Sequence, residues 1–157
     1  MKAATVSEIK RELKSKSEDD LLNLCLHLSK FKKENKELLT YLLYEAEDEA
    51  NFIEGVKDEI DELFLLINTN SYFYIKKSVR KILRMIKKYI RYSKKKQTEV
   101  ELLLHFCKVL KEMKPTMRND IALHNIFKRQ VEMIEKAVSY LHEDLQYDYD
   151  HDLRSLI

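Results

Sequence analysis

Apolar residues recur three and four positions apart over most of the chain, and this spacing predicts amphipathic helices. Four long helices are expected. The first covers about Asp48 to Ile67, the second about Tyr72 to Tyr92, and the fourth about Asn119 to His142. The third follows Lys96 and stops at Lys114, because the residue before a proline avoids the helical conformation. The short connections predict that consecutive helices are antiparallel neighbours.

Shorter helices are expected before these, in residues 1–46. One covers about 8–13, a second starts after the N-cap Ser17 and its run of acids, and a third covers about 34–44. We interpret this segment as a short N-terminal helical hairpin.

The last residues, 146–157, are acidic and rich in tyrosine. They either fray or add one short helix through Leu153, Leu156 and Ile157. Acids alternate from Asp148 to Asp152 as at the start of a calcium loop, but Leu153 stands where that loop needs glycine. We therefore interpret the segment as a solvated acidic tail with at most loose cation binding.

Composition supports an all-α fold. The chain has 157 residues with one glycine and one proline, whereas sheets need turns that favour both residues. This length predicts a single domain, 1–157, in which four longer helices (47–145) follow the hairpin. About seven helices then form an antiparallel array, which is either a helical bundle or a short, HEAT-like α-α superhelix. No internal sequence repeat is evident.

An acidic block precedes a basic block. Between Glu45 and Glu62 there are nine acids and one base, a net charge of −8, and between Lys76 and Lys96 there are eleven bases and no acid, a net charge of +11. If the two helices fold back on the turn at 68–71, positions whose numbers sum to about 139 lie level. The two blocks then either neutralise each other or face partners. The level pairs are Glu62–Lys77, Glu59–Arg80, Asp58–Lys81, Asp48–Arg91 and Glu45–Lys94.

The bases cover more of the second long helix than one row of acids can neutralise. A positive surface is expected to remain after pairing. Its candidate binding residues are Arg84, Lys87, Lys88, Arg91, Lys94, Lys95 and Lys96.

These features predict a non-catalytic helical interaction module, a scaffold or adaptor with segregated acidic and basic faces and an unidentified protein partner. The alternative is nucleic-acid binding through residues 76–96, because lysine and arginine contact phosphates and the interleaved tyrosines can stack on bases. No recognition motif accompanies the pattern. The sequence leaves the oligomeric state open.

Two Cys–His pairs invite a metal interpretation. They are Cys25 with His27 and His105 with Cys107. Residues two apart on a helix point to nearly opposite sides, so neither pair chelates one ion. Both cysteines lie in apolar helical contexts and are expected to be buried free thiols in a reducing compartment. With no apolar run long enough to span a bilayer, this favours a cytoplasmic location without membrane contact.

An enzyme is not expected. The single glycine, Gly55, lies inside a predicted helix, so no glycine-rich phosphate loop exists. His124 lies on an apolar seam and is expected to be a core histidine. No set of nucleophile and base is recognisable, and we predict no catalytic residue, metal or cofactor.

Three segments carry a family resemblance. The stretches SEDDLLNLCLHL at 17–28 and NKELLTYL at 35–42 look like the N-terminal hairpin of a functionally uncharacterised bacterial all-helical family, and 76–92 is similar to its lysine-rich helix. The resemblance spans about the first two-thirds of the chain. It implies a bacterial, intracellular, helical protein and supplies no activity or site residue.

Overall fold

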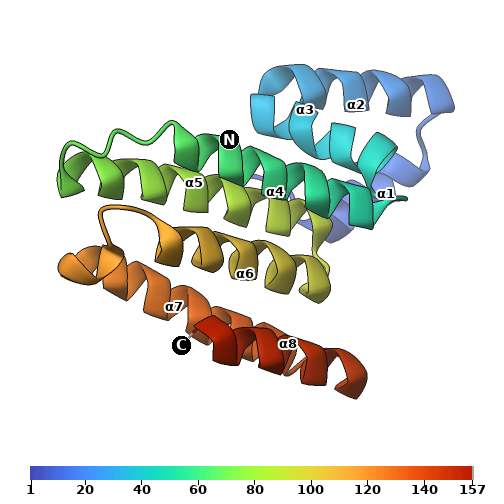
Figure 1. Ribbon diagram of the computed structural model, residues 1–157. Helices are drawn as coiled ribbons and strands as arrows, with labels where there is room; N and C mark the ends of the chain where they lie inside the picture. Colours follow the sequence, from blue (N-terminus) through green and yellow to red (C-terminus); the bar gives the residue numbers. More distant parts are fainter. Residues whose placement is uncertain (157) are drawn as a thin grey trace. The chain divides into compact units, whose positions relative to one another are not determined.

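The computed structural model describes residues 1–156, in which eight α-helices follow one another without a β-strand (Figure 1). The predicted all-α class is confirmed. The helices are α1 (Val6–Lys14), α2 (Glu18–Phe31), α3 (Lys33–Thr40), α4 (Glu49–Leu65), α5 (Tyr72–Ser93), α6 (Lys96–Glu112), α7 (Ile121–Val138) and α8 (Glu143–Leu156), with a π-helix at Tyr41–Glu45 and a 3-10 turn at Met117–Asn119.

The chain divides into two compact units, Met1–Tyr44 and Glu45–Ile157, where the sequence predicts one domain with a hairpin at 1–46. In the N-terminal unit, capping boxes start two helices: Thr5 pairs reciprocally with Glu8, and Ser17 with Asp20. The Ser17 cap confirms the prediction from sequence. Helices α2 and α3 are separated by Lys32 alone, and the Asn35 side chain donates a hydrogen bond to the Leu28 carbonyl at 2.8 Å.

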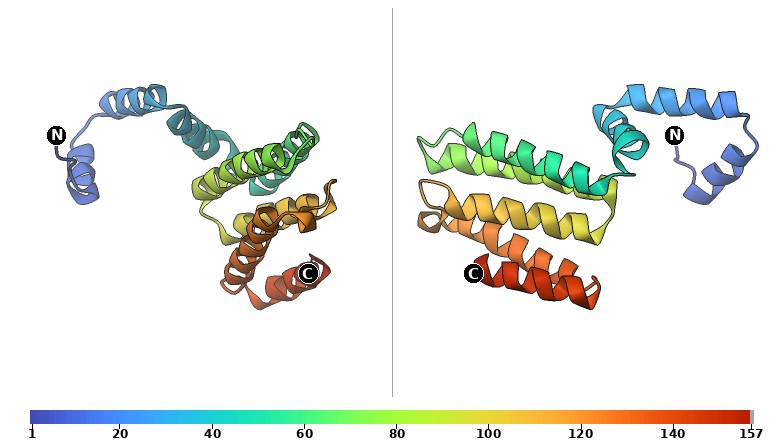
Figure 2. Two further views of the ribbon diagram at one scale, coloured as in Figure 1. Left: turned by 90° about the vertical axis from the view of Figure 1, so that its left-hand side faces the viewer. Right: turned by 45° about the vertical axis from the view of Figure 1, so that its right-hand side comes forward.

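The C-terminal unit holds a continuous core. Its five helices pack side by side with short connections (Figure 2). The buried stripes follow the predicted three-four spacing, with Ile75, Val79, Ile82 and Ile86 on α5 as the example. On the other helices the buried stripes include Val56 and Ile60, Leu103 and Cys107, and Val131 and Ile134.

A constant offset of 44 residues relates the helices of this unit. Lys57 and Asp61 on α4 contact Glu101 and His105 on α6, each exactly one offset further along the chain. Because both contacts keep the same offset, α4 and α6 run parallel. The same offset joins α5 to the start of α7 and α6 to α8, through Tyr72–Thr116, Lys76–Asp120, Lys108–Asp152 and Lys111–Ser155.

Helices that are related by this offset run parallel and lie side by side, so the unit has two layers. Helices α4, α6 and α8 form one layer, and α5 and α7 form the other, with consecutive helices crossing between them. Of the two arrangements left open by the sequence, this is the α-α superhelix, because a closed antiparallel bundle does not stack parallel helices at a fixed offset. A repeat of 44 residues also falls in the range of helical solenoids, about 40 to 47.

Helix α8 differs from the predicted solvated tail. Residues 146–156 belong to a helix of 14 residues whose Tyr149, Leu153 and Leu156 are buried against α6 and α7. The Lys111 ammonium donates to the Ser155 and Leu156 carbonyls, at 3.0 and 2.8 Å, and so satisfies the C-terminal end of α8. Of the tail's acids, Asp148 and Asp150 are exposed, whereas Asp152 contacts Lys108 on α6. The interpretation as a solvated tail was therefore wrong, and the alternative of a terminal helix through Leu153 and Leu156 is confirmed, while Ile157 lies outside the described residues.

Candidate interaction surface on helix α5

Helix α5 has two opposite faces. Its apolar face fills the core, and the other face carries bases at spacings of three and four residues, which place them in one row along the helix. The row extends over fifteen residues, 77–91, which is about 21 Å at the rise of an α-helix. We call it the basic stripe, and its members are Lys77, Arg80, Lys81, Arg84, Lys87, Lys88 and Arg91.

Most of the basic stripe makes no polar contact within the chain. The ammonium of Lys88 lies 5.4 Å from the centroid of the Tyr89 ring, within the range of a cation–π contact. Among residues 1–156, no side-chain hydrogen bond or ion pair involves the other six members, Lys77, Arg80, Lys81, Arg84, Lys87 and Arg91.

The acidic block does not neutralise this stripe. In the part of the chain that the structure describes, none of the five level pairs predicted between the blocks forms an ion pair. Two acids of α4 contact α6 and its preceding turn instead: Asp61 Oδ1 lies 2.7 Å from His105 Nε2, and Glu49 Oε2 lies 2.9 Å from Lys95 Nζ. The predicted pairs assumed that α4 and α5 form a single antiparallel hairpin. They fail because α4 packs against α6 as well as α5.

The predicted site residues separate into two groups. Arg84, Lys87, Lys88 and Arg91 lie together on the stripe, with Lys87 and Lys88 half-buried. The three lysines of the following turn lie apart from them. Lys94 is the exposed left-handed C-cap of α5 with φ 57°, Lys95 pairs with Glu49, and Lys96 Nζ lies 2.6 Å from Glu99 Oε2.

An open groove of about 530 Å³ runs beside the stripe. Its lining combines bases with the apolar side chains of Phe73 and Leu83, and Phe73 is 68% exposed. The sequence prediction of the binding surface omits three residues of the stripe, because it places them in ion pairs with α4. They are Lys77, Arg80 and Lys81. The complete lining is Phe73, Lys76, Lys77, Arg80, Leu83, Arg84 and Lys87.

A second groove, of about 490 Å³, continues from α5 onto α7. Lys87 contributes to both grooves, and Arg129 and Lys136 add positive charge from α7, next to Glu132. The floor includes Gln130, whose Nε2 donates to the Ile126 carbonyl at 2.9 Å while its buried Oε1 has no partner within the described chain. The charge is therefore mixed on α7 and wholly positive only on α5.

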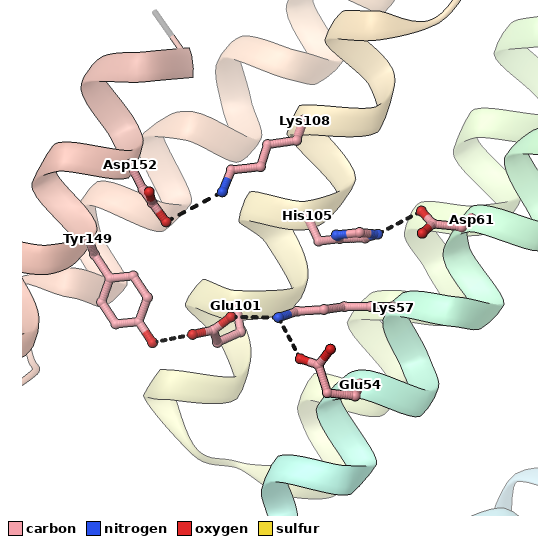
Figure 3. A network of polar contacts seen from close by, with 8 residues as sticks. All are labelled: Glu54, Lys57, Asp61, Glu101, His105, Lys108, Tyr149 and Asp152. Atoms are coloured by element: carbon pink, nitrogen blue, oxygen red, sulfur yellow. Dashed lines mark hydrogen bonds and ion pairs between the residues drawn. The ribbon is translucent and has the colours of Figure 1, made fainter.

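A polar network crosses the other layer (Figure 3). Lys57 Nζ lies 2.9 Å from Glu54 Oε1 and 2.8 Å from Glu101 Oε2, and Tyr149 donates its hydroxyl to Glu101 Oε1 at 2.5 Å. Asp61–His105 and Lys108–Asp152 extend the network along α4, α6 and α8. Apart from Glu54, which lies three residues from Lys57, the partners are 44 to 48 residues apart, so the sequence alone does not bring them together.

The network shifts the pKa values of its half-buried members. Burial by itself disfavours both charges, but the hydrogen bonds of Lys57 to Glu101 and Glu54 outweigh it and raise the pKa of Lys57. For Glu101 the hydrogen bonds from Lys57 and Tyr149 likewise outweigh burial and lower its pKa. Burial and the bond to Glu101 raise the pKa of Tyr149. The groups are thus held in their ordinary charge states, as in a structural network.

Other candidate chemistry is dispersed. Within the described residues, no group of three or more His, Cys, Asp or Glu side chains could hold a metal ion. His124 is exposed rather than in the core, because Leu123 and Phe127 take the inward positions of α7. Cys107 is buried as predicted, but Cys25 is exposed on α2, which corrects its predicted burial.

The two thiols should react very differently. Cys25 is exposed, whereas Cys107 is fully buried and its burial raises its pKa to about 12. At about pH 8 we expect a thiol reagent to label one cysteine in the native protein and both in denaturant, as counted by mass spectrometry. A Cys25→Ser variant should lack the fast reaction, and rapid native labelling of Cys107 in that variant would contradict the buried site.

No helix within the described chain has both the length and the apolar character required to cross a membrane. Comparison with protein-family models, with curated proteins and with solved structures finds no match for this chain.

Proposed function

We propose that the chain is a non-catalytic interaction module that binds an acidic segment of a protein partner along the basic stripe. The observation that carries the proposal is the unneutralised row of bases on the solvent face of α5. Six cations without an intramolecular partner create a positive potential along about 21 Å of helix. A stable fold does not need such a row, since like charges on one helix face repel.

The surroundings of the stripe favour a short acidic segment over a long polyanion. The acids of α4 lie on one flank, and Glu132 and Glu135 lie on α7. A long nucleic acid leaving α5 would meet these negative side chains, whereas an acidic peptide of about ten residues in extended form matches the stripe, at about 3.3 Å per residue with its ends free. Charge complementarity of this kind governs specificity and association rate.

Binding is tested with a fluorescein-labelled peptide of ten mixed Asp and Glu residues, by fluorescence anisotropy at low and moderate salt. Double reversal on the stripe, Arg84→Glu with Arg91→Glu, is expected to raise Kd at least tenfold. The matched control, Lys14→Glu with Lys16→Glu, changes the net charge equally but removes two exposed bases of the N-terminal unit. Its Kd should change less than twofold. If both variants weakened binding equally, the peptide would be responding to the net charge of the protein, and the proposal of a specific binding surface on α5 would be refuted.

Single-stranded nucleic acid is a second candidate, and the specific observation that favours it is Phe73. This exposed ring lies in the basic groove and contacts Tyr74 edge-on, with ring centroids 5.4 Å apart. Basic tracks with aromatic platforms are the usual means of binding single strands. In the same assay with a short oligonucleotide, Phe73→Ala should weaken nucleic-acid binding several-fold and leave peptide binding unchanged. Absence of binding at low salt would exclude this candidate.

A further inference from the structure

Helix α2 in the N-terminal unit exposes an apolar ridge. Its members are separated by three, four and three residues, which puts them in one row on the helix. Leu24, Leu28 and Phe31 are 41%, 57% and 70% exposed, and Leu21 is half-buried. We call Leu21, Leu24, Leu28 and Phe31 the α2 seam.

The N-terminal unit leaves this seam uncovered. Across residues 6–40, none of the helices α1, α2 and α3 buries a residue. A unit of 44 residues is also near the lower limit at which a hydrophobic core alone sustains a fold. A row of exposed apolar side chains along one helix is typical of an interaction site.

The spacing of the seam specifies what kind of surface covers it. Intervals of three, four and three residues are those of positions a and d in a coiled coil, where each side chain inserts between residues of a facing helix. A helix with an equivalent ridge therefore fits the seam better than a flat or extended surface does.

Charge along α2 identifies the partner. The acids Glu18, Asp19 and Asp20 stand at its N-terminal end, and the bases Lys30 and Lys32 stand in its last turn and at its C-cap. This polarity repels a parallel copy of the same helix and attracts an antiparallel one. From the seam and the charge polarity together, we propose that a second copy of this chain covers the α2 seam in an antiparallel, two-fold symmetric pair.

In a symmetric pair the two-fold axis passes through the middle of the seam, which is level with Leu26. Positions of the two copies then meet where their numbers sum to 52. This register places Leu24 against Leu28 of the other copy and Leu21 against its Phe31. With Leu21 at position a, Glu18 and Lys32 both take position e, and these positions flank the seam on the same side of an antiparallel pair. A two-fold interface makes each of these contacts twice.

Cys25 supplies an internal reporter of this pair. It lies one residue from the axis, so the two Cys25 residues of a pair are offset by about 3 Å along the helices, from the rise per residue. Cys107 is buried and does not compete for reagent. A short bis-maleimide should therefore link two chains through Cys25.

The pair is measured by sedimentation velocity and by bis-maleimide cross-linking over the micromolar to submillimolar range. A seam of about 15 Å is short, so association is expected to be weak, with Kd in the micromolar range. We expect a concentration-dependent dimer that cross-links through Cys25. Leu24→Glu with Leu28→Glu should raise Kd at least tenfold. The control, Val6→Glu with Ile9→Glu, alters two exposed apolar residues of α1 and should leave the dimer intact.

Charge reversal tests the register itself. Glu18→Lys alone and Lys32→Glu alone should each weaken self-association, whereas in an equimolar mixture of the two variants each heterodimer regains opposite charges beside the seam and should form near the wild-type level. Circular dichroism of each variant verifies that helix content is unchanged. A monomer at every concentration, a dimer insensitive to the seam variants, or a mixture without recovery would each overturn the proposal. Such an outcome would leave binding along the basic stripe untouched, since α5 lies in the other unit.

Discussion

Replacing Phe106 by alanine is expected to lower the free energy of unfolding by about 3 to 5 kcal/mol, the range for large aromatic truncations in protein cores. Phe106 is fully buried on α6, the helix that touches every other helix of the C-terminal unit. Its ring packs at 59° to that of Phe64 on α4, with centroids 5.8 Å apart. Truncation leaves a cavity between the layers, because neighbouring helices fixed by other contacts collapse only partly.

Urea unfolding followed by circular dichroism measures the loss. Phe73→Ala is the matched control, since it removes the same ring from an exposed position and should change the stability by less than about 0.5 kcal/mol. Similar losses for the two variants would mean that Phe106 does not occupy the core.

Glu101→Ala is expected to cost about 1 to 3 kcal/mol, the usual penalty for leaving a half-buried polar group without its partner. Glu101 is the only residue in Figure 3 that accepts hydrogen bonds from two other helices, from Lys57 on α4 and Tyr149 on α8. Its removal loosens both neighbours at once. Glu54→Ala removes the exposed partner of the same lysine and should cost less than about 0.5 kcal/mol.

The cost of Glu101→Ala should depend on pH in a defined way. The pKa of Glu101 lies below its ordinary value of 4.5, so its contribution is present above that pH and is lost as the pH falls through the folded pKa. The pKa of Lys57 lies above its ordinary value of 10.5, so its contribution is lost as the pH rises through the folded pKa. Unfolding titrations of both proteins should therefore show the largest difference between these limits and a smaller one in acid. A difference that grows in acid would contradict this assignment.

The helices of the C-terminal unit could largely be predicted from the sequence, because each buries a stripe of apolar residues at three-four spacing. Ile75, Val79, Ile82 and Ile86 on α5 are an example, all predicted and all buried. Helix α8 was harder to predict. Its buried Tyr149, Leu153 and Leu156 follow the same spacing, but the surrounding acids and a partial resemblance to a calcium loop obscured it.

The offset of 44 residues was not visible in the sequence. Between 45–88 and 89–132 only three positions carry the same residue, Val56/Val100, Leu66/Leu110 and Ile82/Ile126. Packing needs apolar character at these heights rather than identity, so the structural repeat persists where the sequence repeat does not. The choice between bundle and superhelix therefore required the contacts between α4 and α6.

The basic surface was predicted in part. Arg84, Lys87, Lys88 and Arg91 were identified because one acidic helix cannot neutralise every side of α5. Lys95 and Lys96 were assigned to the same surface, although their charges are balanced by Glu49 and Glu99 in the turn. Such local pairs depend on backbone direction at Lys94, whose left-handed conformation no pattern of charge predicts.

The regular offset also has a consequence for how this chain can change in length. Inserting or deleting one whole period of 44 residues keeps the buried stripes of the surviving helices in phase, while one or two residues inserted within a helix turn part of its stripe away from the core. Duplication of one helix pair would therefore lengthen the array and its surface without changing the existing core contacts. The array is in this sense modular, with stability accumulating from one neighbour to the next along the stack.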